Sequence, residues 1–266
     1  MGHLVFDGDH IRAEMTLATG DTCSDKLAVV FDFYSPGRRG FGHLGPLRTA
    51  LARGYDCLTV MPAANDWYVN DETASFEGVL WGLTHGLRDV RGFGMSMGGF
   101  GALRFARAMR ASYVSVLSPQ VSMAPDVAAF ETRYTVDGDG FDPALGDLRR
   151  HKVEDLRGAI YVDPFDRADM AHARLLSAIA PNLSLCRLAG GGHPAHKGLR
   201  QAGHKRAIND MAFTDVPDPG AIARLHNRAK AGTQIYWKGL RARAEGERAA
   251  LAAYASAQLA AARQAA

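Results

Sequence analysis

The five residues GMSMG at positions 94–98 decide the fold. The apolar run Val90–Phe93 leads into them, and the helix-forming segment Gly98–Arg110 follows. A serine between two glycines, where a strand passes into a helix, is typical of a nucleophile elbow, because the sharp turn lifts the hydroxyl above the edge of a sheet. The glycines permit a strained backbone and a close approach of the helix. The pattern therefore predicts Ser96 as a nucleophile.

Short apolar or β-branched runs alternate with helix-like segments on both sides of this elbow. The runs are His3–Phe6, Ile11–Leu17, Leu27–Tyr34, Tyr55–Met61, Val90–Gly94, Tyr113–Leu117, Ala159–Val162 and Leu183–Leu188. The helical segments are His43–Arg53, Asp71–Leu87, Gly98–Arg110, Asp169–Ala180 and Ala195–Ala212. This alternation predicts an α/β fold with an eight-stranded, mostly parallel sheet flanked by helices. Four residues separate the first two runs, so we expect an antiparallel hairpin there.

A catalytic serine needs a base, and the base needs an acid to orient it. His193 follows the last predicted strand after three glycines, so it is the expected base, with His196 as its rival. For the acid we expect Asp163, which ends the seventh strand, or else Asp166 in the loop beyond it. Asp169 is expected to cap the helix that begins there, because an aspartate at that position satisfies a free backbone N–H.

Two backbone N–H groups are expected to form the oxyanion hole. The N–H of Met97 lies at the start of the helix after the nucleophile, where the helix dipole favours negative charge. The second donor is expected from Tyr34 or Ser35, after the third strand. The segment Asn65–Tyr68, after the fourth strand, either lines the substrate pocket or is simple packing.

The order Ser96, Asp163, His193 on eight strands resembles the α/β-hydrolase superfamily over residues 1–213. The motifs FGMSMGG from Phe93, LSPQ ending at Gln120 and GHP around His193 also look like those of a bacterial subgroup found among surface-polysaccharide and glycan-modifying proteins. The resemblance implies an acyl-serine mechanism. The sequence lacks the His-Gly motif that esterases of this superfamily usually carry after the third strand, and has FYSPG at residues 33–37 instead.

Composition and charge limit the other functional classes. The chain has 266 residues, 47% of them hydrophobic and 22% charged, which is typical of globular proteins. We expect a hydrolase domain over residues 1–216, with a cap-like insertion at 120–157, and a helical extension over 217–266. The net charge of +3 is the sum of +5 in the extension and −2 in residues 1–216. The main domain therefore gives no electrostatic reason to expect a nucleic-acid partner.

The sequence lacks the patterns typical of cofactor-binding and of secreted proteins. Residues 92–98 have the glycines of a dinucleotide loop, but no acidic residue follows between Asp89 and Asp126 to bind a ribose. No cysteine or carboxylate pattern accompanies His193-x-x-His196, so neither a metal nor an organic cofactor is expected. Three scattered cysteines and no secretory signal favour a cytoplasmic protein without a membrane span.

Together these observations predict a serine carboxylic-ester hydrolase that acts on a small-molecule or glycan ester through an acyl-serine intermediate. One alternative is an O-acyltransferase, in which a glycan or polysaccharide hydroxyl intercepts the same acyl-enzyme. Another is a non-catalytic binding or scaffolding module. Under that alternative the sparse apolar stripe of the C-terminal helices would mediate a homo-oligomer.

Overall fold

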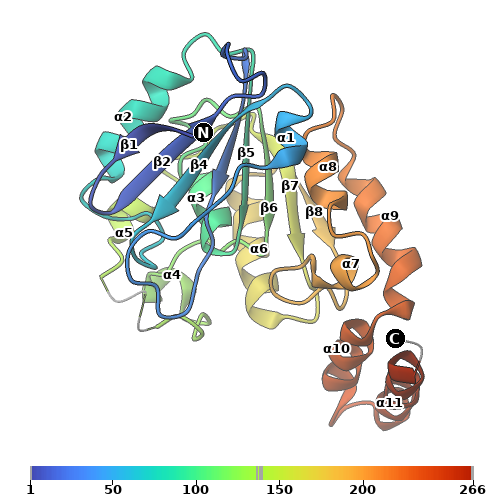
Figure 1. The fold of residues 1–266 in the computed structure, drawn as a ribbon. Coiled ribbons are helices and arrows are strands. Elements are labelled where there is room, and N and C mark those ends of the chain that lie inside the picture. The colour runs from blue at the N-terminus through green and yellow to red at the C-terminus, as the bar shows by residue number, and fades with distance from the viewer. Residues whose placement is uncertain (1, 136, 138–139, 265–266) are drawn as a thin grey trace.

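A single sheet of eight strands runs through the part of the chain that the computed structural model describes, residues 2–135, 137 and 140–264 (Figure 1). The strand order across the sheet is β1-β2-β4-β3-β5-β6-β7-β8. The strands are β1 (His3–Asp7), β2 (Ile11–Thr16), β3 (Lys26–Phe31), β4 (Asp56–Pro62), β5 (Asp89–Met95), β6 (Tyr113–Leu117), β7 (Arg157–Val162) and β8 (Leu183–Arg187). All eight predicted strands are present, each within three residues of its predicted ends.

The sheet is parallel except at one edge. β1 and β2 form the predicted antiparallel hairpin, and β2 pairs antiparallel with β4. From β4 to β8 every neighbouring pair is parallel. The carboxyl ends of β5, β6, β7 and β8 therefore lie along one edge, which is the edge at which open parallel sheets place their functional groups.

Two layers of helices cover the sheet, one on each face. Successive side chains of β3 point to opposite faces and show that each face has its own apolar core. Leu27, Val29 and Phe31 face one apolar core, while Ala28 and Val30 face a second core on the opposite side. The first core is closed by α2 (Thr73–Leu83), α3 (Met97–Arg104) and α6 (Arg167–Ile179). The second core is closed by α1 (Arg48–Leu51), α7 (Lys197–Gln201), α8 (Ala207–Ala212) and α9 (Pro219–Ala229). Because both faces are covered, β3 reads as a continuous apolar run.

The helices predicted over Ala195–Ala212 and His43–Arg53 differ most from those in the structure. The single helix predicted over Ala195–Ala212 is two helices, α7 and α8. Gly203, which has a φ of +84°, ends α7. The N–H of His204 donates to the carbonyl of Leu199 and that of Gly203 to the carbonyl of Arg200, which is the Schellman arrangement. The helix predicted over His43–Arg53 is reduced to α1.

The segment between β6 and β7 contains α4 (Pro125–Ala128) and α5 (Pro143–Gly146) and, within its described residues, no strand. Residues 136, 138 and 139 of this insertion lie outside the described part of the chain. The insertion leaves β6 and returns to β7 across the carboxyl edge of the sheet (Figure 1). It is therefore placed to contribute side chains at that edge.

The C-terminal residues form α9, a short 3₁₀ turn (Lys230–Gly232), α10 (Gln234–Ala244) and α11 (Ala249–Gln264). α9 packs against the sheet and buries Ile222 in its core, whereas α10 and α11 form a helical hairpin beside α7 (Figure 1). This hairpin has its own small apolar core around Trp237 and Leu259. Among the described residues, none of the helices combines the length and apolar character needed to cross a membrane.

Candidate active site

Ser96 lies in a strained turn between β5 and α3. Its backbone has a φ of 51° and a ψ of −122°, a conformation that L residues rarely adopt. Its N–H donates to the carbonyl of Leu117 at the end of β6, 2.8 Å away. A Cβ on Gly94 would collide with the carbonyl of Gly98, and a Cβ on Gly98 would collide with the carbonyl of Phe31. The two glycines that flank the serine are therefore required by close backbone contacts.

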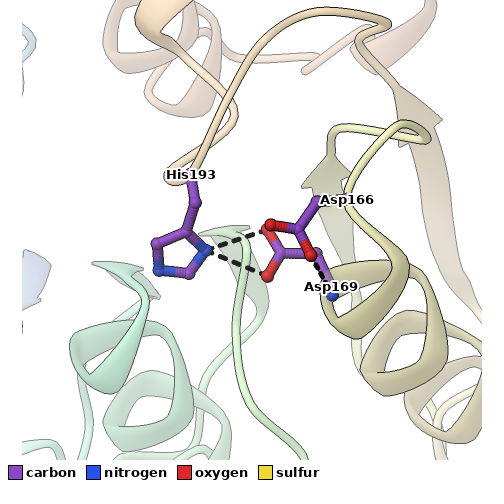
Figure 2. A group of neighbouring side chains, drawn as sticks. All are labelled: Asp166, Asp169 and His193. Atoms are coloured by element: carbon purple, nitrogen blue, oxygen red, sulfur yellow. Dashed lines mark hydrogen bonds and ion pairs between the residues drawn. The ribbon is translucent and has the colours of Figure 1, made fainter. Parts of the chain in front are cut away.

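Ser96, His193 and Asp169 form a continuous chain of hydrogen bonds. His193 Nε2 lies 3.0 Å from Ser96 Oγ. On the other side of the ring, His193 Nδ1 lies 2.9 Å from each carboxylate oxygen of Asp169 (Figure 2). With Nδ1–H donating to the carboxylate, Nε2 keeps its lone pair and can accept the serine proton. The three residues come from the turn after β5, the loop after β8 and the first turn of α6.

Asp169 is buried and ionised. Its side chain is 0% exposed. Burial opposes the charge, but the hydrogen bonds from His193 and Ser118 and the positive charge of Arg133 outweigh burial, so the pKa of Asp169 lies below its ordinary value. A carboxylate that stays charged fixes the tautomer of the imidazole and stabilises the imidazolium that forms when it takes a proton.

Asp163, which the sequence predicted as the partner of His193, has a different role in the structure. Its carboxylate accepts hydrogen bonds from the N–H groups of Phe165, Gly190 and Gly192, at 2.9, 2.9 and 2.8 Å. It therefore anchors the glycine loop that carries His193 and does not orient the ring. Burial raises the pKa of Asp163 despite these three donors.

The roles expected of Asp166 and Asp169 are exchanged. Asp166 is the N-cap of α6 and accepts a hydrogen bond from the N–H of Asp169 at 2.9 Å. Asp169, expected as the cap, lies three positions further into the helix, and there its carboxylate reaches the imidazole (Figure 2). Helix geometry explains why Asp169 and not Asp166 reaches the imidazole. The side chain at the third helical position points back over the start of the helix, toward the loop that carries His193.

The rival base His196 lies elsewhere. It is the residue before α7 and lines a cavity of about 140 Å³ together with Phe33, Phe93 and Lys205. Burial lowers the pKa of His196, and its Nδ1 has no hydrogen-bond partner among the described residues. Of the two candidates, His193 is the one within hydrogen-bond reach of Ser96.

Of the two residues considered for the second oxyanion donor, the structure leaves Tyr34 available. The N–H of Ser35 donates to Asn65 Oδ1 at 3.2 Å, so it is already used. Within the described residues, the N–H groups of Tyr34 and Met97 have no recorded acceptor. Both lie at the carboxyl edge of the sheet beside the serine turn, after β3 and after β5.

Trp67 and Gln120 form a chain of two hydrogen bonds that ends on the hydroxyl of Ser96. Gln120 Nε2 donates to Ser96 Oγ at 3.2 Å, and Trp67 Nε1 donates to Gln120 Oε1 at 3.2 Å. Both side chains are fully buried, so Trp67 and Tyr68 are packing residues and do not line an open pocket. Gln120 ends the LSPQ motif, but no pattern in the sequence indicates that its side chain contacts the serine.

The insertion contributes three residues that the sequence did not indicate. Arg133 Nη1 lies 2.9 Å from Asp169 Oδ1, and its Nη2 lies 2.6 Å from Glu131 Oε2. The same oxygen, Glu131 Oε2, also lies 3.0 Å from His172 Nε2, and His172 Nδ1 accepts a hydrogen bond from the N–H of Val121. The hydroxyl of the third residue, Tyr134, lies 3.1 Å from His193 Nε2.

Comparison with solved structures shows which fold carries this site. The capsule O-acetyltransferase of Neisseria meningitidis serogroup A superimposes with a TM-score of 0.54 at 13% identity, over 77% of this chain and 93% of that chain. Est1E from Butyrivibrio proteoclasticus superimposes with a TM-score of 0.52 at 16% identity, over 79% of this chain and 96% of that chain. FphF, a fluorophosphonate-binding serine hydrolase of Staphylococcus aureus, gives 0.50 at 14% identity, over 81% and 98%.

The chain has the α/β-hydrolase fold. No family model matches the sequence, and comparison with curated proteins finds no match either. At these identities the likeness shows the fold alone.

Within this α/β-hydrolase fold, one cluster has the composition of a cation site. Asp166, Asp169 and His193 each offer a ligand atom, and these atoms lie within 4.8 Å of one another (Figure 2). The guanidinium of Arg133 already lies among them, 2.9 Å from Asp169 and 3.4 Å from both Asp166 and His193 Nδ1. Arg133 supplies the positive charge that a metal would bring, so the donor set does not fit a metal ion.

Proposed function

We propose that the protein is a serine carboxylic-ester hydrolase that works through an acyl-serine intermediate. The observation that carries the proposal is the hydrogen-bonded chain from Ser96 Oγ through His193 to Asp169. Each link is within the distance that proton transfer and ring orientation require. The strained serine turn and the start of α3 supply the remaining elements of such a site.

The proposed reaction has two steps. Ser96 Oγ attacks the ester carbonyl while its proton passes to His193 Nε2. The N–H groups of Met97 and Tyr34 donate to the oxyanion of the tetrahedral intermediate. The C–O bond to the alcohol then breaks, and the alcohol leaves with the proton from Nε2. A water molecule attacks the acyl-serine with His193 as base, and the acid is released as Ser96 recovers its proton.

An O-acyltransferase is the second candidate. It is favoured by the likeness of the fold to a capsule O-acetyltransferase and by the burial of Ser96, which is 4% exposed. In this reaction a carbohydrate hydroxyl takes the place of water in the second step. The acyl-serine is the same in both candidates, so evidence for the intermediate supports both.

The experiment that tests the proposal is labelling with a fluorophosphonate probe, followed by identification of the modified peptide. We expect the wild-type protein to be labelled on Ser96 and Ser96→Ala to remain unlabelled. A folded wild-type protein that does not react, or one that reacts equally well as Ser96→Ala, would refute an activated serine at this position. The binding-module alternative would then be preferred, and the C-terminal helices would be examined for a partner.

A cytoplasmic location and a homo-oligomer formed through α10 and α11 remain part of the proposal. The free thiols of Cys23, Cys57 and Cys186 support a reducing compartment. Assembly is tested by measuring the mass in solution with and without residues 217–266. A mass that is monomeric in both forms would refute the homo-oligomer.

A further inference from the structure

Two hydroxyl groups meet at the same nitrogen of His193. Ser96 Oγ lies 3.0 Å from Nε2 and the hydroxyl of Tyr134 lies 3.1 Å from it. Because Nδ1–H is committed to Asp169, Nε2 has one lone pair and can accept from one hydroxyl at a time. Tyr134 therefore competes with the nucleophile for the base.

The phenol remains a donor in this competition. Burial raises the pKa of Tyr134, so its hydroxyl is protonated at neutral pH. When it donates to Nε2, Ser96 must direct its own proton elsewhere, for example to the oxygen of Tyr134. A serine without its base is a weak nucleophile.

The hydroxyl oxygen of Tyr134 also lies where the oxygen of an acyl acceptor would have to lie. The alcohol or water that attacks an acyl-serine must lie within hydrogen-bond reach of Nε2 and beside Ser96 Oγ. The hydroxyl oxygen of Tyr134 lies 3.1 Å from Nε2 and shares this nitrogen with Ser96 Oγ, which lies 3.0 Å from it, so it meets both conditions. Tyr134 thus holds the place of the acyl acceptor.

Contacts on both sides hold Tyr134 in this position. Its ring packs against Tyr34 and Trp67, with centroids 4.7 and 5.5 Å apart. The preceding residue, Arg133, is paired with Asp169 at 2.9 Å. Beyond it, Asp137 accepts the hydroxyl of Tyr34 at 2.9 Å. The insertion is therefore fastened to the site before and after Tyr134.

We propose that Tyr134 occupies the site of the acyl acceptor, so that a water molecule or an alcohol reaches the acyl-serine only by displacing the phenol. This inference rests on the proposed acyl-serine chemistry. In the transfer step the acceptor O–H gives its proton to Nε2 and its oxygen bonds to the acyl carbon. The bond from that carbon to Ser96 Oγ breaks, and the proton passes from Nε2 to Ser96.

The test compares the rate of Ser96 labelling by a fluorophosphonate and the rate of p-nitrophenyl acetate hydrolysis in three proteins. Tyr134→Phe keeps the ring and removes the competing hydroxyl. Asp137→Asn loosens the same insertion without touching the base, and serves as the matched control. Losing one competing hydrogen bond corresponds to about a threefold to tenfold gain in rate, which we expect for both rates in Tyr134→Phe. Asp137→Asn is expected to stay within about twofold of the wild type on the same scale.

Unchanged or slower rates in Tyr134→Phe would overturn the inference, and a slower rate would make the phenol a donor that assists the reaction. An equal gain in Asp137→Asn would also overturn it, because mobility of the insertion would then explain the effect. If neither the wild type nor Tyr134→Phe is labelled on Ser96, the proposed function itself fails, and the inference fails with it.

Discussion

The guanidinium of Arg133 lies 2.9 Å from the same carboxylate of Asp169 that accepts the hydrogen bond from His193. Arg133 belongs to the insertion between β6 and β7, while Asp169 belongs to the first turn of α6. A cation from a segment outside the sheet is thus in contact with the acid of the proposed catalytic chain. The position of the insertion and the electrostatics of the site are therefore linked.

Replacing Asp169 tests which aspartate orients the base. Asn at this position keeps the shape but cannot stabilise the imidazolium, so kcat for p-nitrophenyl acetate is expected to fall about 10³-fold or more. Asp166→Asn is the matched control, because it alters a helix cap next to the same ring. Its kcat is expected to fall less than about tenfold, since asparagine caps a helix about as well as aspartate. Equal losses in the two variants would contradict the assignment of Asp169.

Replacing Arg133 with Gln tests the electrostatic link through the pH dependence of kcat/KM. The groups facing His193 Nδ1 are Asp169, Asp166 and Arg133. Removing the cation favours the protonated imidazole, which cannot act as a base. The acid limb of the profile is therefore expected to move to higher pH, by about one unit for a charge at this distance. Arg133→Lys keeps the charge and should keep the limb near its original position. A limb that stays in place in Arg133→Gln would show that Arg133 acts on structure alone.

Replacing Glu131 with Gln tests the buried network behind the insertion. Burial opposes the charge of Glu131, but hydrogen bonds from His172 and Arg133 outweigh it and place its pKa far below the ordinary value of 4.5. Its charge therefore stabilises the folded protein above about pH 4.5, and this stabilisation is lost as the pH falls.

We expect Glu131→Gln to lower the free energy of unfolding by about 2–3 kcal/mol near pH 7, measured by urea denaturation. The difference from the wild type should shrink when both are measured near pH 4. Glu154→Gln, at an exposed position, should change little at either pH. A difference that stays constant with pH would mean that the charge of Glu131 is not what stabilises the fold.

The serine turn is tested by adding one methyl group. A Cβ on Gly98 would meet the carbonyl of Phe31, so Gly98→Ala is expected to cost about 3 kcal/mol or more, or to prevent folding. Gly78→Ala is the control, since Gly78 lies inside α2 with open space where its Cβ would go. There alanine should raise stability by up to about 1 kcal/mol. Thermal melting of both variants checks this, and a neutral Gly98→Ala would contradict the close packing of the turn.

The sequence was sufficient for the sheet and for part of the site. Apolar runs such as that of β3 reflect burial on both faces, a property that is local in the sequence. Ser96 and His193, which the structure brings within 3.0 Å of each other, were predicted because glycines mark the turns that present them. The division of Ala195–Ala212 into two helices was missed, because Gly203 could equally have been tolerated within one helix.

The aspartate could not be chosen from the sequence for a geometric reason. Asp163, Asp166 and Asp169 lie within seven residues, and which carboxylate reaches the imidazole depends on where α6 starts. Arg133 and Tyr134 carry no local signal at all. Their contacts with Asp169 and His193 span 36 and 59 residues and exist because the insertion folds over the edge of the sheet.

The most direct test of the central claim is to trap the acyl-enzyme. The protein is mixed with p-nitrophenyl acetate, quenched in acid within one turnover, and digested for peptide mass spectrometry. The proposed mechanism predicts one acetyl group on Ser96 in the wild type and none in Ser96→Ala, which should also lose the release of p-nitrophenol. Turnover that persists in Ser96→Ala, or an acetyl group that is found on another residue while Ser96 stays unmodified, would contradict it.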